Sequence, residues 1–87
     1  MSNADLLRKL QVLRAGVSSG QIEINEAYTN FEALTYLLAN VARPDEQALH
    51  DMVNDIEMIR FGLLPEDQRL AVRDVLVKAE MIFRRYS

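Results

Sequence analysis

Residues 43–65, RPDEQALHDMVNDIEMIRFGLLP, decide the fold class, because they hold one helical pattern between two turn signals. The apolar residues recur at spacings of three and four, which is the period of an amphipathic α-helix. Pro44 suits the first turn of a helix and Gly62 suits its end, while Pro65 and the acidic residues after it open another helix. The stretch therefore predicts a helix over residues 45–61 and a further helix over residues 65–86. The apolar stripe of the first of these consists of Ala48, Leu49, Met52, Val53, Ile56 and Ile59.

Two more helices are predicted before this stretch, over residues 3–18 and 25–42. Asn3 is a good N-cap residue, the second of these helices is expected to begin at Asn25, and Pro44 is expected to stop it. Because the connections are short, neighbouring helices should be antiparallel, so we expect an all-α protein with a single domain, an antiparallel four-helix bundle. The core stripes of these helices and of the last one are Leu6, Leu10, Leu13 and Val17; Ala27, Phe31, Leu34, Leu38 and Val41; and Val72, Leu76, Ala79 and Phe83.

The composition bounds the classes of function. A chain of 87 residues makes one small domain, and without cysteine it has neither a disulfide nor a thiolate metal site. No stretch offers the ~20 predominantly apolar residues of a membrane span, and Asp5, Arg8 and Lys9 interrupt any early signal-type run. We therefore expect a cytoplasmic protein. The net charge of −3 disfavours direct binding of nucleic acid, since phosphate contacts need a surplus of Lys and Arg.

The charge is spread unevenly along the chain. Residues 21–57 hold eight acidic side chains against Arg43, a net charge of −7, whereas residues 1–20 and 58–87 each carry +2. One interpretation is a solvated face whose acids oppose basic outer helices, which adds little stability. The other is an acidic surface that steers a basic protein partner toward the chain and rejects wrong ones.

Several residues of this acidic part are candidates for partner contacts. Tyr36 projects away from the core face of its helix, where it either lies over a neighbouring helix or anchors an interface. Phe61 points away from the core stripe of its helix, and it is expected either to fold beneath the turn at Gly62, which is favoured, or to serve as an exposed interface anchor. On the helix over residues 45–61, helical positions separate one flank with Glu46, His50 and Glu57 from another with Asp51 and Asp55. The candidate partner-binding set is Glu23, Glu26, Tyr36, Asp45, Glu46, Asp51, Asp55 and Glu57.

The last helix has a second apolar stripe, formed by Leu70, Val77 and Met81 and directed away from its core stripe. One helix of a four-helix bundle needs a single stripe. The second stripe therefore either closes a wider core or forms an apolar interface with a partner or with a second copy of the chain.

Catalysis and metal binding are not expected. His50 is the only histidine; it shares a helix face with Glu46, but a catalytic metal site usually needs three protein ligands. The chain has neither a Gly-rich phosphate loop nor a nucleophile elbow, and its paired carboxylates lie on open helix faces that do not favour acid catalysis. We therefore expect a protein that is not an enzyme and has no metal and no cofactor.

Residues 19–28, SGQIEINEAY, resemble the opening of the colicin D-like bacterial immunity proteins. Those proteins carry a small-Gly-x-Ile-x-x-x-Glu-Phe type segment between their first two helices; here Ala27 replaces the aromatic residue and Tyr28 follows it. The later order over residues 49–83 is similar too: an acidic helix, a short turn and a closing helix.

The resemblance implies a cytoplasmic antidote that binds the basic nuclease domain of a cognate bacterial toxin and blocks its RNA-binding cleft with carboxylates. By position, the candidates for this role are Asp45, Glu46, Asp51, Asp55 and Glu57, with Glu23, Glu26 and Tyr36 behind them. Two other interpretations stay open. One is a phage or bacterial adaptor or inhibitor, such as a secretion chaperone or an anti-defence protein, and the other is a homodimeric regulatory helical protein.

Overall fold

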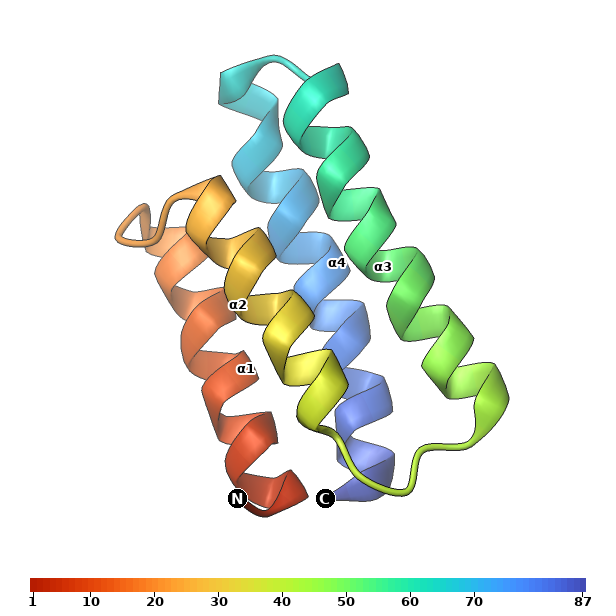
Figure 1. The fold of residues 1–87 in the computed structure, drawn as a ribbon. Coiled ribbons are helices and arrows are strands. Elements are labelled where there is room, and N and C mark those ends of the chain that lie inside the picture. Colours follow the sequence, from red (N-terminus) through yellow and green to blue (C-terminus); the bar gives the residue numbers. More distant parts are fainter.

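The four helices run alternately up and down in the computed structural model, which describes all residues 1–87 (Figure 1). Their bounds are Asn3–Ser19 for α1, Ile24–Leu37 for α2, Arg43–Gly62 for α3 and Pro65–Tyr86 for α4. The prediction of an all-α, antiparallel four-helix protein is confirmed.

The start of α1 is capped by Ser2 rather than by the predicted Asn3. The Ser2 hydroxyl accepts a hydrogen bond from the Asp5 amide at 3.1 Å, and the Asp5 carboxylate accepts one from the Ser2 amide at 3.3 Å. This reciprocal arrangement is a capping box. Asn3 has a different role, because its side chain bonds the backbone of Ala39 and of Tyr86 at 3.0–3.1 Å. It joins the start of α1 to the α2–α3 connection and to the end of α4.

The end of α2 differs from the prediction, because the helix stops at Leu37 instead of continuing to residue 42. Leu38 turns into extended backbone with ψ 124° and is buried, and Asn40 has a left-handed φ of 62°. The prediction relied on proline as the stop. Tertiary hydrogen bonds from the amides of Ala39 and Ala42 hold the connection instead, and they end the helix earlier.

The other boundaries lie close to those expected. α2 begins one residue early, at Ile24, after a Glu23 cap whose side chain makes no capping bond. α3 begins at Arg43, two residues early, and α4 covers residues 65–86 as predicted. A proline lies in the first turn of both α3 and α4, followed by acidic residues that favour a helix N-terminus.

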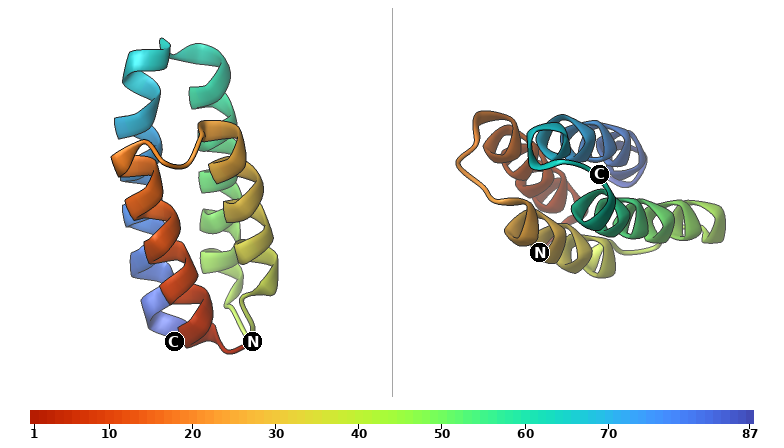
Figure 2. Two further views of the ribbon diagram at one scale, coloured as in Figure 1. Left: turned by 90° about the vertical axis from the view of Figure 1, so that its left-hand side faces the viewer. Right: turned by 90° about the horizontal axis from the view of Figure 1, so that it is seen from above.

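The helices form two layers, with α2 and α3 in front and α1 and α4 behind (Figures 1 and 2). α1 packs mainly on α4, and α3 packs on both α4 and α2. Both termini lie at the same end of the bundle. None of the four helices is both long enough and apolar enough to cross a bilayer.

The core fills the space between the two layers, and the predicted stripes point into it. Val41, Ala48, Met52 and Ile59 are only partly buried and lie at its border. Val75 and Ile82 of α4 are also buried, so the buried face of this helix is wider than its predicted stripe. The buried apolar residues are Leu6, Leu10, Leu13, Val17, Ala27, Phe31, Leu34, Leu38, Leu49, Val53, Ile56, Val72, Val75, Leu76, Ala79, Ile82 and Phe83.

One charged side chain, Glu80 of α4, is buried at the α1–α4 contact. Its Oε2 accepts a hydrogen bond from Arg14 Nε at 2.7 Å, whereas its Oε1 has no partner. A buried carboxylate needs such a cation, because burial removes the water that would otherwise solvate the charge. Arg14 and Glu80 therefore fix α1 on α4.

Candidate protein-binding surface on α2 and α3

The two layers of the bundle carry opposite charge. Residues 21–62, which form the front layer with its connections, hold eight carboxylates against Arg43 and Arg60, a net charge of −6. The remaining residues hold eight basic side chains against five acidic ones, a net charge of +3. The acidic run found in the sequence therefore becomes one layer of the molecule.

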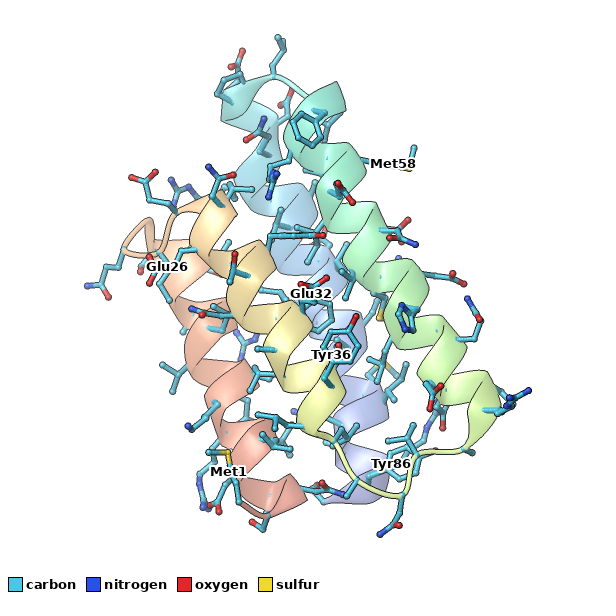
Figure 3. The ribbon with its side chains drawn as sticks, in the orientation of Figure 1. Met1, Glu26, Glu32, Tyr36, Met58 and Tyr86 are labelled. Carbon is cyan, nitrogen blue, oxygen red and sulfur yellow. The ribbon has the colours of Figure 1, made fainter.

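Tyr36 and His50 meet across the front layer. Tyr36 comes from the last turn of α2 and His50 from the first half of α3, and their ring centroids lie 6.1 Å apart in an edge-to-face arrangement. The Tyr36 side chain is 68% exposed and points toward α3 (Figure 3). The ring therefore contacts a neighbouring helix, as one of the two expectations stated, while most of its surface stays exposed.

A pocket of about 390 Å³ opens beside this aromatic pair. Glu46 lies on its rim, so a carboxylate and two aromatic rings face the same space. Such a combination suits a cationic side chain, since rings and carboxylates both attract positive charge. The lining residues are Thr35, Tyr36, Leu38, Asn40, Val41, Glu46, Leu49 and His50.

A second pair of contacts crosses the front layer closer to the α3–α4 turn. The Arg60 guanidinium carbon lies 4.7 Å from the centroid of the Tyr28 ring and 4.9 Å from that of Phe61. Burial raises the pKa of the Tyr28 phenol, and the carboxylates of Glu32 and Glu57 raise it further. The phenol therefore stays protonated at neutral pH and remains a hydrogen-bond donor.

These residues lie along the contact between α2 and α3, and we name them together the α2–α3 seam. Glu46, His50 and Glu57 were predicted to share a flank of α3, but the predicted site residues did not include Tyr28, Glu32, His50 or Arg60. The spacing of Tyr28, Glu32 and Tyr36, four residues apart on α2, is the sequence signal that identifies the other side of the seam. The seam consists of Tyr28, Glu32 and Tyr36 on α2 and of Glu46, His50, Glu57 and Arg60 on α3.

The structure does not bring all eight predicted partner-binding residues together. Tyr36, Glu46 and Glu57 belong to the seam. Glu23 and Glu26 are exposed at the start of α2, and Asp51 and Asp55 are exposed on the opposite flank of α3. Asp51 accepts a hydrogen bond from the Gln47 side chain at 3.1 Å.

Asp45 lies apart from all of these and has partners inside the chain. Its carboxylate accepts a hydrogen bond from Arg85 at 2.8 Å and another from the Tyr86 hydroxyl. Its side chain is only 19% exposed. We therefore assign Asp45 to the α3–α4 contact and remove it from the partner-binding set.

The burial of Phe61 and of the second α4 stripe can be compared with the expectations from the sequence. Phe61 is 75% exposed and does not fold beneath the turn at Gly62, so that expectation was wrong; its ring stacks with Arg60 instead. Leu70, Val77 and Met81 are 56%, 43% and 58% exposed, so the second stripe of α4 does not close a wider core.

No family model, curated protein or solved structure matches this chain. No three His, Cys, Asp or Glu side chains lie close enough together to hold a metal ion.

Proposed function

We propose that the protein is a small acidic protein-binding module whose α2–α3 seam covers a basic surface of another protein. The observation that carries the proposal is the separation of charge, which puts a net −6 on the layer that also holds the exposed ring of Tyr36. An acidic surface around an aromatic anchor gives fast, steered association and a desolvated contact point.

The partner class that this surface fits best is a nucleic-acid-processing toxin with a basic cleft, as the resemblance to the colicin D-like immunity proteins implies. Carboxylates on a helical face can occupy the positions that phosphates take on such a cleft, because both are anionic acceptors for Lys and Arg. In this role the protein is a cytoplasmic antidote that needs neither a cofactor nor a catalytic group.

The pocket beside Tyr36 would hold the central side chain of the partner. An Arg or Lys side chain of the partner would lie against the Tyr36 ring and pair with Glu46, while Glu57 and Glu32 extend the acidic contact along the seam. Asp51, Asp55, Glu23 and Glu26 lie outside the contact and act through their long-range field on the association rate.

The partner is identified first, by affinity purification from the native host with mass spectrometry, together with inspection of the adjacent reading frame for a toxin. Binding is then measured by calorimetry for two variants with the same change in net charge. Glu46→Lys/Glu57→Lys alters the seam, and Asp51→Lys/Asp55→Lys alters the opposite flank of α3.

We expect the seam variant to lose at least ~100-fold in affinity and the flank variant less than ~10-fold. Ion pairs in direct contact contribute more to affinity than charges that act at long range through screening salt. Equal losses in both variants would show that net charge, and not the seam, drives binding. Unchanged binding in the seam variant, or a partner without a basic surface, would refute the proposal.

A further inference from the structure

The outward face of α4 carries an apolar stripe that nothing in the chain covers. Leu70, Val77 and Met81 lie opposite the buried face of the helix, and between 43% and 58% of each side chain is exposed. The helix belongs to the rear layer, whereas the α2–α3 seam lies on the front layer (Figure 2).

Charged residues flank the stripe in a particular order along the 22 residues of α4. Glu66 and Asp67 lie at its start, Asp74 and Lys78 near its middle, and Arg84 and Arg85 at its end. Helical positions put Glu66 and Arg84 on one side of the stripe, and Asp67, Asp74, Lys78 and Arg85 on the other.

We propose that a second copy of the chain packs on this stripe, with the two α4 helices antiparallel and related by a two-fold axis. The axis passes between residues 75 and 76, so Leu70 meets Met81 of the second copy and Val77 lies close to its own counterpart. In this register Asp74 faces Lys78 of the second copy, and Glu66 faces Arg84.

The charge order supports the antiparallel arrangement over the parallel one. In a two-fold antiparallel pair each flank faces the same flank of the other copy, with the direction reversed. Acids at one end of α4 then oppose bases at the other end, and every such contact occurs twice. A parallel two-fold pair in register would instead bring opposite flanks together at the same height, with Glu66 near Asp67 and Arg84 near Arg85 of the second copy, which are like charges.

The groups needed for these contacts are free in the single chain. Glu66, Lys78 and Arg84 make no side-chain ion pair, and the Asp74 contact with Arg73 at 3.0 Å is exposed and easily exchanged. Exposed ion pairs add little to affinity, so they set the orientation while the apolar stripe supplies the affinity. One helix pair is a small interface, and we expect dissociation in the range of ~10–100 µM.

Sedimentation equilibrium between ~5 and ~500 µM tests the dimer, with Val77→Asp as the disrupting variant. The matched control is Val12→Asp, because Val12 is 68% exposed on α1 and lies outside the proposed contact. Val77→Asp should weaken dimerisation at least ~10-fold and the control should leave it unchanged. A wild-type protein that stays monomeric, or equal losses in both variants, would overturn the proposal.

Disulfide trapping tests the orientation, because the natural chain contains no cysteine. Leu70→Cys and Met81→Cys variants, mixed and oxidised, should give a cross-linked heterodimer, and each variant alone should give little product. Efficient cross-linking of Leu70→Cys with itself would indicate a parallel pair and contradict the proposal.

Reciprocal charge substitutions test the register, with the dimer affinity measured by sedimentation equilibrium. Lys78→Asp should weaken the dimer about 3- to 10-fold, because two attractive contacts become repulsive. The double variant Asp74→Lys/Lys78→Asp restores both contacts with reversed sign and should recover the affinity. Failure of the double variant to recover would exclude this register.

Discussion

The contacts of Asp45 in the structure assign it a role that its place in the sequence does not indicate. It belongs by sequence to the acidic run, yet its carboxylate is held by Arg85 and Tyr86 of α4. The next residue, Glu46, makes no such contact and lies on the rim of the pocket beside Tyr36. Two adjacent acids in the first turn of α3 therefore have different roles, one in folding and one in the proposed binding.

This difference predicts opposite outcomes for two matched substitutions. Asp45→Ala should lower the free energy of unfolding by about 1–2 kcal/mol, because it removes two charge-assisted hydrogen bonds. Glu46→Ala should change it by less than ~0.5 kcal/mol, although both lose the same favourable first-turn charge. Urea unfolding followed by circular dichroism measures both, and equal losses would contradict the structural role of Asp45.

The Tyr86 phenol makes the same contact sensitive to alkaline pH. Its hydrogen bond to the Asp45 carboxylate is the main cause that raises the pKa of Tyr86 in the folded protein. The stabilisation is complete below the unfolded pKa of ~10 and is lost as the pH rises through the higher folded pKa. Stability should therefore fall above pH ~10 by more in the wild type than in Tyr86→Phe. Parallel pH curves for the two proteins would refute the prediction.

At the scale of the helices, two long-range contacts hold the elements in place. Asn3 bonds the backbone of Ala39 and Tyr86, residues 36 and 83 positions away, and so gathers three elements at one end of the bundle. Arg14 and Glu80 link α1 to α4 nearer the middle. Both contacts depend on which helices become neighbours, so neither is visible in a local pattern.

The Asn3 contact should matter for stability. Asn3→Ala removes three hydrogen bonds to backbone groups and should destabilise the fold by about 1–2 kcal/mol. The control is Asn54→Ala, at an exposed position of α3 without a side-chain hydrogen bond, where the better helix propensity of alanine leaves stability unchanged or slightly raised. Thermal unfolding compares the two variants, and similar melting temperatures would argue against a stabilising role of the Asn3 hydrogen bonds.

The Arg14–Glu80 pair predicts a strongly non-additive mutant cycle. Arg14→Met leaves a buried carboxylate without its cation and should cost about 2–4 kcal/mol, whereas Arg14→Met/Glu80→Met should recover much of this loss. Arg8→Met, which breaks only the exposed pair with Asp5, should cost less than ~0.5 kcal/mol. Chemical denaturation of the wild type, Arg14→Met, Glu80→Met and the double variant supplies the four corners of the cycle, and additive losses would rule out the coupling.

At the scale of the whole molecule, the two proposed surfaces belong to different layers of helices. The seam lies on the acidic front layer, and the stripe of Leu70, Val77 and Met81 lies on the rear layer. A dimer formed through α4 therefore leaves two seams free and directed outward. Such a dimer would present two equivalent binding surfaces.

The two surfaces should consequently act independently. Val77→Asp should leave the affinity for a monovalent partner within ~2-fold of wild type, and Glu46→Lys/Glu57→Lys should leave dimerisation within ~2-fold. Calorimetry and sedimentation measure the two affinities. Loss of both activities in either variant would show that the faces are coupled.

The amino-acid sequence by itself determined the class of fold, the number of helices and most of the core. Those features follow from local signals, since the 3.6-residue period and turn residues such as Gly62 and Pro65 act within one or two helical turns. It also revealed the acidic run and the exposed second stripe. It could not show that Phe61 stays exposed or that α2 ends at Leu37.

Only the tertiary structure decided where the charges meet. It sequestered Asp45, paired Arg14 with Glu80, and joined Tyr36 to His50 across two helices. These contacts depend on which helix lies beside which, at what height and with which face, and helical periodicity carries none of that information. The packing of α2 against α3 brought only part of the acidic run of the sequence into the seam that we propose as a binding surface.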